Sequence, residues 1–240
     1  MKVFTFGEVM LRLKTPEHLK ILQADTFEAN YGGAEANVAV SLATLGDDVS
    51  YVTKVPEHQV GQAAVNEIRR FGVDTSRVLR GGGRVGIYYF EKGTNIRPTS
   101  VVYDRAYSAI AMAKAEEFDW EKLLDGVDLF YFSGITPAIS TEIEKALENA
   151  LALCREKKIQ VVCDLNYRGK MWSTKDAQRV MRRLMAYVDV CIANDEDFES
   201  SLGIPAYDGD MSRGIEQIES YKEGMLEIPV SYTHLRAHET

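Results

Sequence analysis

Residues 127–167 read VDLFYFSGITPAISTEIEKALENALALCREKKIQVVCDLNY and show the alternation of apolar runs and helical spacing from which the fold is predicted. The two ends, 127–135 and 159–167, are near-continuous apolar runs, which are typical of parallel strands covered on both faces. Between them, residues 141–157 have helical spacing, and Thr141 and Glu144 stand at capping-box positions. This order of strand, helix and strand predicts an α/β fold with a largely parallel sheet.

The same alternation extends in both directions along the chain. Further strands are predicted over 2–11, 49–55 and 188–194, and further helices over 36–45, 62–71 and 175–187. Residues 80–105 interrupt the alternation, because two β-rich runs surround a Gly- and Pro-containing turn with no helix between them. This segment is predicted to be a hairpin outside the main sheet.

The bulk composition excludes several classes of protein. A chain of 240 residues is long enough for one sizeable core. The net charge of −8 argues against nucleic-acid binding and gives no reason to expect attraction to an anionic membrane. The three cysteines form no CxxC pair, which indicates reduced core thiols. No signal peptide and no apolar run of about 20 residues is found, so a cytoplasmic protein is predicted.

A glycine pair opens the helix in Tyr31–Gly46, YGGAEANVAVSLATLG. Such a pair lets the backbone approach a ligand closely, and a helix N-terminus offers free N–H groups. Asn37 in the first turn carries both donors and an acceptor suited to vicinal hydroxyls. It heads a polar stripe with Ser41 and Thr44. The alternative interpretation is a tight turn in which Asn37 caps the helix or faces water.

The hairpin carries a second group of candidate residues. Tyr103 and Arg105 are two residues apart, so on a strand they point to one face, and Tyr88 lies on the other run. A flap of this kind closes over a small polyol and excludes water. The alternative is an exposed sheet face that packs on a partner chain. Both interpretations are compatible, because a two-stranded flap is rarely stable alone.

Polar residues follow two of the predicted strands. Asp164, Asn166 and Arg168 follow the strand in 159–167, where open parallel sheets present ligand sites. Arg168 has a planar fork suited to a carboxylate or a phosphate, or it forms a structural salt bridge.

The strand in 188–194 leads into a run of polar residues, Asn194, Asp195, Glu196 and Asp197. Their oxygens suit a hydrated Mg²⁺ near phosphates. They equally suit the solvated first turn of a helix, where acids favour the helix dipole.

Taken in order, FGEVMLRL, YGGAEANVAVSLATLG, FGVDTSRV, GIYYFEKG and NDEDF resemble the motifs of the PfkB (ribokinase-type) family of carbohydrate kinases. The stretches TFGEVMLRL, VVYDRAYSA and DLNYRGKMW are most similar to its 2-keto-3-deoxygluconate kinase subgroup. The resemblance covers residues 2–227. It implies a ribokinase-like fold, in which a mainly parallel sheet is flanked by helices and a small β flap forms a lid.

The resemblance also implies an activity, the ATP-dependent, Mg²⁺-assisted phosphorylation of 2-keto-3-deoxygluconate to its 6-phosphate. The substrate contacts that it implies are Gly33, Asn37, Tyr88, Tyr103, Arg105 and Arg168. Two arginines fit a substrate with a carboxylate better than a neutral hexose. The alternatives are a kinase for fructose or ribose, or a non-catalytic sugar-binding or oligomerising fragment.

The family's N-x-x-E element, associated with phosphate and Mg²⁺, falls on Asn194 to Asp197. Asp197 stands where the family usually has glutamate, so Glu196 is the alternative ligand. The family's GAGD-type loop, which carries the catalytic aspartate, has no counterpart in the sequence. The chain is therefore expected to be truncated and inactive, with no catalytic residue present.

Three expectations concern the boundaries and partners of the chain. Residues 1–230 are expected to be the N-terminal portion of a kinase domain, with the flap at about 80–106. Residues 231–240, SYTHLRAHET, are expected to be a non-native tail. A homo-oligomer in which flaps pack together is also expected.

Overall fold

The structure is a computed structural model of the chain, and it describes residues 1–204 and 236–239. The chain divides into two compact units, Met1–Glu117 and Phe118–Thr240. Among the described residues, none of the helices has the length and apolar character needed to cross a membrane.

The first unit contains ten elements and two short 3-10 turns. In chain order they are β1 (Lys2–Phe6), β2 (Met10–Lys14), η1 (Ile21–Gln23), β3 (Glu28–Gly32), α1 (Ala34–Thr44), β4 (Asp48–Val52), β5 (Lys54–Val55), α2 (Gln59–Arg69), β6 (Leu79–Arg80), β7 (Gly86–Glu91), β8 (Ser100–Asp104) and η2 (Ala115–Glu117). The predicted helices at 36–45 and 62–71 are confirmed as α1 and α2, each beginning two or three residues earlier.

The core of the first unit lies around the parallel pair β1 and β4, on which α1 packs. Phe4 and Phe6 of β1 and Tyr51 of β4 are fully buried there. The predicted single strand over 2–11 is wrong, because β1 ends at Phe6 and β2 belongs to another sheet. The chain changes sheet just after Gly7, where a side chain would meet the Glu35 carboxylate at 2.0 Å.

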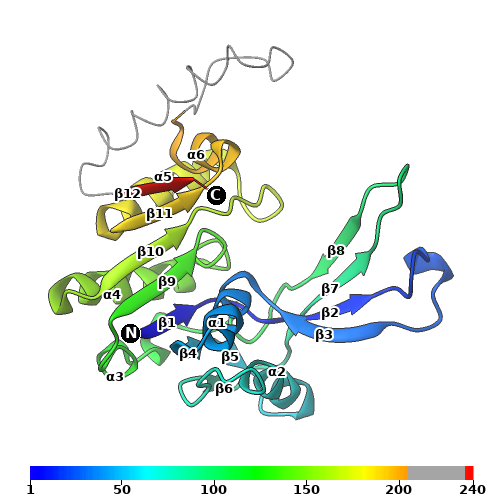
Figure 1. Ribbon diagram of the computed structural model, residues 1–240, viewed down its shortest axis with the longest axis horizontal. Helices are drawn as coiled ribbons and strands as arrows, with labels where there is room; N and C mark the ends of the chain where they lie inside the picture. The colour runs from blue at the N-terminus through cyan, green and yellow to red at the C-terminus, as the bar shows by residue number, and fades with distance from the viewer. Residues whose placement is uncertain (205–235, 240) are drawn as a thin grey trace. The chain divides into compact units, whose positions relative to one another are not determined.

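The predicted hairpin is confirmed as the antiparallel pair β7 and β8. Two strands that were not predicted extend it, giving a four-stranded flap sheet in the order β3-β2-β7-β8. Figure 1 shows these strands side by side as an arm. β2 pairs antiparallel with β3 and parallel with β7, so the flap has the extra strands that a hairpin needs for stability.

The second unit repeats the strand–helix alternation. Its elements are α3 (Trp120–Leu123), β9 (Leu129–Ser133), α4 (Thr141–Lys157), β10 (Gln160–Asp164), α5 (Thr174–Leu184), η3 (Met185–Tyr187), β11 (Val190–Ala193), α6 (Asp195–Leu202) and β12 (Arg236–Glu239). β9, β10, β11 and β12 are neighbours in that order, all parallel (Figure 1). The α/β class with a mainly parallel sheet is thereby confirmed.

Helix α4 has its predicted bounds, but the predicted capping residue is wrong by one position. Ser140, not Thr141, is the N-cap, and its hydroxyl accepts a hydrogen bond from the Ile143 backbone N–H at 3.3 Å. The apolar face of α4 then lies in the core, with Leu147 and Leu151 fully buried.

The expected boundary at residue 230 and most of the expected tail lie outside the described residues. Only Arg236–Glu239 of the tail is described, as β12 alongside β11. The non-native origin of residues 231–240 stays a prediction.

Candidate functional site

Gly33 is the N-cap of α1 and has an extended backbone, with φ of −171°. A side chain there would place its Cβ 2.0 Å from the Glu8 carbonyl oxygen. Gly33 therefore leaves room for the Glu8 backbone, and the predicted close approach of a ligand to the glycine pair stays a prediction. A Cβ at the preceding Gly32 would meet only the Asn37 Oδ1, at 3.3 Å.

Asn37 lies in the first turn of α1, and its backbone N–H donates to the Gly33 carbonyl at 2.8 Å. Its side chain is exposed, as are those of Ser41 and Thr44, so the predicted polar stripe is confirmed. An exposed amide beside a helix N-terminus has the donors and the acceptor that a polyol needs. Asn37 stays a candidate for substrate binding.

Tyr88 and Tyr103 stand directly opposite each other on β7 and β8. Their ring centroids are 5.9 Å apart, and the Arg105 guanidinium carbon lies 6.0 Å from the Tyr103 centroid. The prediction that these side chains share one face of the flap is confirmed.

Glu8 is a residue that the sequence pattern did not single out. It is 3% exposed, its carboxylate is ion-paired with Arg105, and it accepts a 2.6 Å hydrogen bond from the Ser108 hydroxyl. A buried carboxylate needs such partners, because desolvation of an unpaired charge is expensive. The available signal was an acid inside the apolar run FTFGEVML. Glu8 connects the backbone at Gly33 with the side chain of Arg105.

Arg12 was also missed, although it lies on the face that carries the tyrosines. It stands opposite Tyr88 in the register of β2 and β7. Its guanidinium carbon lies 4.3 Å above the Phe90 ring centroid. Burial raises the pKa of Tyr88, and the nearby charge of Arg12 opposes that shift. The sequence pattern that could have identified it is the alternation in MLRLK. On a strand, Arg12 points to one face and its neighbours Leu11 and Leu13 point to the other.

The second unit holds the residues predicted at the ends of β10 and β11. After β10, Asn166 takes the left-handed conformation (φ of 38°), which asparagine tolerates better than most residues. Arg168 is exposed and donates to the Tyr167 carbonyl at 2.8 Å. Among residues 1–204 and 236–239 no carboxylate forms a salt bridge with Arg168, and its side chain is exposed, so the guanidinium is accessible to an anion.

Asn194 is the N-cap of α6, and its Oδ1 accepts from the Asp197 backbone N–H at 2.8 Å. The Asp197 carboxylate accepts in turn from the Tyr167 backbone N–H at 2.8 Å and is 9% exposed. Glu196 is exposed. The interpretation of this run as a helix first turn is confirmed, and Glu196 is more open to a ligand than Asp197.

The surroundings of Asp164 and Asp197 disfavour the negative charge of both carboxylates. Burial, followed by the charge of Asp197, raises the pKa of Asp164, and burial also raises the pKa of Asp197. A cation nearby would offset both effects. Within 1–204 and 236–239, no three His, Cys, Asp or Glu side chains gather to hold a metal by themselves. Any Mg²⁺ here would be held by one or two protein carboxylates, and water and phosphate oxygens would complete its coordination.

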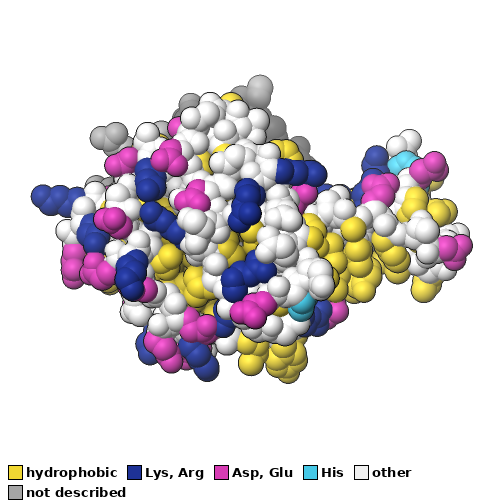
Figure 2. Space-filling view, turned by 90° about the horizontal axis from the view of Figure 1, so that it is seen from below, with side chains coloured by type: hydrophobic (Ala, Val, Ile, Leu, Met, Phe, Trp, Pro, Cys, Tyr) yellow, Lys and Arg dark blue, Asp and Glu magenta, His cyan; other side chains and the backbone are white. Residues whose placement is uncertain are grey.

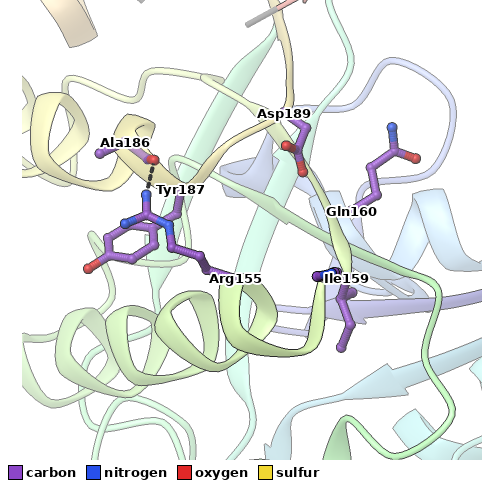
Figure 3. Close-up of a pocket in the computed structure, with 7 residues that line it drawn as sticks. Arg155, Ile159, Gln160, Ala186, Tyr187 and Asp189 are labelled. Atoms are coloured by element: carbon purple, nitrogen blue, oxygen red, sulfur yellow. Dashed lines mark hydrogen bonds between the residues drawn. The ribbon is translucent and has the colours of Figure 1, made fainter. Parts of the chain in front are cut away.

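A surface hollow of about 650 Å³ lies elsewhere in the second unit. Figure 3 shows it between the end of α4 and the first residues of β10 and β11, near Arg155, Gln160 and Asp189. The Arg155 guanidinium carbon lies 4.2 Å above the Tyr187 ring centroid. The candidate residues follow the opposite, carboxyl ends of these strands, so the hollow is not part of that cluster.

Comparisons with known proteins agree on one family. Residues 1–226 match the pfkB family carbohydrate kinase profile. A 2-dehydro-3-deoxygalactonokinase of Haloferax volcanii is 36% identical over 209 residues, 87% of this chain and 64% of that protein. A 2-dehydro-3-deoxygluconokinase of Bacillus subtilis is 30% identical over 170 residues, 70% of this chain and 52% of that protein.

The crystal structure of a 2-dehydro-3-deoxygluconokinase from Thermotoga maritima superposes with a TM-score of 0.92. It is 49% identical, and the match covers 99% of this chain and 72% of that chain. The predicted fold is confirmed by this likeness. The chain spans 64% of the length of the Haloferax volcanii relative and 52% of the Bacillus subtilis relative.

Proposed function

The chain belongs to the pfkB family of carbohydrate kinases, and from that premise we propose that it binds 2-keto-3-deoxygluconate. In a protein of its relatives' length, the bound sugar acid accepts the γ-phosphate of ATP on its 6-hydroxyl. The names of the Bacillus subtilis and Thermotoga maritima relatives support this substrate, since 2-dehydro and 2-keto denote the same group.

The observation that carries the proposal is the clustering of the candidate residues in the first unit. Tyr88, Tyr103 and Arg105 share one face of the flap, and Glu8 links Arg105 to the backbone at Gly33. Hydroxyl and amide groups suit the polyol part of the ligand, and guanidinium groups suit its carboxylate. Gly33 and Asn37 are the other proposed substrate contacts of the first unit, and Arg168 is the one proposed contact that belongs to the second unit.

The residues of the second unit are proposed to serve ATP. Asn194, Glu196 and Asp197 would lie near the phosphates, with Glu196 or Asp197 ligating Mg²⁺ through oxygen. The bound Mg²⁺ would neutralise phosphate charge during transfer. Asn194 and Asp197 also hold the first turn of α6, so these protein groups are already fixed before ATP binds.

A second candidate substrate is the C4 epimer, 2-keto-3-deoxygalactonate. The Haloferax volcanii relative carries the name of that activity and is 36% identical to this chain. The two sugar acids share the carboxylate and the keto group, so the flap residues suit both. The two sugar acids differ only in configuration at C4, so contacts with the C4 hydroxyl must discriminate between them.

A partner chain is proposed for the other face of the flap sheet. Leu13, Tyr89 and Val102 stand opposite one another on β2, β7 and β8, and Val102 is 51% exposed. Figure 2 shows hydrophobic side chains gathered on the arm that this sheet forms. A second copy of the chain would cover this face in a symmetric dimer.

The test is calorimetric titration of this chain with both sugar acids, with fructose and ribose as neutral controls. Binding is measured because the sequence contains no GAGD-type loop. We expect saturable binding of at least one sugar acid and none of the neutral sugars. Preference for fructose or ribose, or no binding at all, would contradict the proposal.

A further inference from the structure

We propose that Arg12 binds the carboxylate of the sugar acid and makes the flap selective for acids over neutral sugars. The inference rests on the proposed function and adds a specificity-determining residue to it. Arg12 lies in the stretch FGEVMLRL and is not among the substrate contacts that the family resemblance implies.

The position of Arg12 is set by strand register. Arg12 stands opposite Asn30 on one side and Tyr88 on the other, and Tyr88 stands opposite Tyr103. Paired residues in a sheet point to the same face. The four side chains therefore form one row across the flap sheet, on the face that carries the proposed substrate contacts.

Arg12 also differs from its neighbours in charge pairing. Lys14 pairs with Glu28 at 2.8 Å, Arg84 with Asp104 at 2.8 Å, Arg97 with Glu91 at 3.5 Å, and Arg105 with Glu8. Among the described residues, no carboxylate pairs with Arg12. Its Nε is buried without a hydrogen-bond partner. A buried, unpaired donor on a cation is costly, and an incoming carboxylate would satisfy it.

The geometry of the guanidinium suits that ligand. Its carbon lies 4.3 Å above the Phe90 ring centroid, close enough for a stacked or cation–π arrangement. Stacking restricts the orientation of the group before the ligand arrives. The planar fork can then donate two parallel hydrogen bonds to one carboxylate. Less side-chain entropy is lost on binding than for a free arginine.

The competing explanation is that Arg12 is structural, packing against Phe90 and supporting the Tyr88 hydroxyl by a hydrogen bond. Arg12→Met separates the two roles, because methionine keeps an apolar stem over the ring and removes the donors. Arg105 is a poorer test residue, since its removal leaves the buried Glu8 carboxylate without its ion-pair partner. Arg12→Met leaves no buried carboxylate without its partner, because no carboxylate among the described residues pairs with Arg12.

The experiment is calorimetric titration with 2-keto-3-deoxygluconate and with its methyl ester, which is neutral and of similar shape. The wild-type chain is expected to prefer the acid. Arg12→Met should weaken acid binding by about 10- to 100-fold and leave ester binding unchanged, which abolishes the preference. The matched control is Arg84→Met. Arg84 pairs with Asp104, which stands opposite Ile87 in the register of β7 and β8. Ile87 and Asp104 alternate with Tyr88 and Tyr103 and therefore lie on the other face of the flap sheet.

Arg12→Lys is the second variant, in case the methionine variant does not fold. It keeps the charge and loses the fork, so acid binding should fall several-fold while ester binding stays the same. Loss of acid and ester binding in equal measure, or no change in either, would overturn the assignment of Arg12 alone. If the wild-type chain binds neither sugar acid, the proposed function fails and this inference fails with it.

Discussion

Glu8 constrains the residues around it through both its backbone and its side chain. A Cβ at Gly33 would lie 2.0 Å from the Glu8 carbonyl oxygen, and a Cβ at Gly86 would lie 2.8 Å from Glu8 Oε1. The two glycines therefore leave room for one buried acid, and they stand at the start of α1 and of β7. A side chain at either glycine should therefore displace Glu8 and the residues that contact it.

Gly33→Ala should lower the free energy of unfolding by about 1–3 kcal/mol, because the Glu8 backbone must move to admit the methyl group. Urea denaturation measures the change. The matched control is Gly83→Ala, where a Cβ meets nothing within 4 Å. A Gly33→Ala variant as stable as the Gly83→Ala control would show that the close approach is not maintained in solution.

The carboxyl of Asp164 predicts a pH dependence of stability. Its pKa is raised above the ordinary 3.8 by burial and by Asp197, so the folded chain binds this proton more tightly than the unfolded chain. The stabilisation from the bound proton is complete below the unfolded pKa. It is lost as the pH rises through the higher folded pKa.

Asp164→Asn should remove the part of the dependence that this carboxyl contributes and raise the free energy of unfolding at about pH 7 relative to the wild-type chain. Urea denaturation at about pH 4 and about pH 7 gives the comparison. Asp25→Asn, at an exposed position, is the control and should leave the wild-type dependence in place. A slope in Asp164→Asn as steep as in the wild-type chain would mean that other groups, such as Asp197, produce it.

At the scale of the element, the residues of the first turn of α6 have both a structural role and a proposed role in ligand binding. Asn194 caps the helix, and Asp197 holds the chain after β10 through Tyr167. Both residues were selected from the sequence for phosphate and Mg²⁺ chemistry. Any variant must therefore be examined for stability before its ligand binding is interpreted.

Asn194→Ala should cost about 1 kcal/mol of stability, since it removes the acceptor for the Asp197 N–H. Asn194→Asp should restore most of that loss, because aspartate caps about as well. Glu199→Ala, at an exposed position of the same helix, is the control, with an expected change within about 0.5 kcal/mol. Chemical denaturation compares all three, and an unaffected Asn194→Ala would exclude the capping role.

Elements were predictable where one local pattern spans the whole element. The helix over 141–157 and the three strands of the second unit near it follow from apolar periodicity alone. The predicted strand over 2–11 failed because its apolar run passes through Gly7, where the chain leaves the sheet and the Glu35 carboxylate occupies the space of a side chain. β3 was not predicted, since its residues EANYG lack an apolar alternation.

At the scale of the whole molecule, the apolar face of the flap predicts self-association. The wild-type chain should sediment as a dimer at micromolar concentration, because burial of this face is favourable. Val102→Asp should shift it to a monomer, since a charge would be buried at the interface. Met112→Asp, exposed but outside the flap sheet, should remain dimeric. A monomeric wild-type chain, or a dimeric Val102→Asp chain, would exclude this interface.

The sequence by itself determined the α/β class, the hairpin, the family and the main candidate residues. Each of these depends on patterns a few residues long, such as the apolar runs, the glycine pair and the spacing of Tyr103 and Arg105. Only the tertiary structure decided that Glu8 joins Arg105 and Ser108, 97 and 100 residues away, and that Arg12 lies beside Tyr88. The physical reason is strand register: which side chains meet across a sheet depends on pairing between distant segments, and a shift of one residue would turn every side chain to the other face.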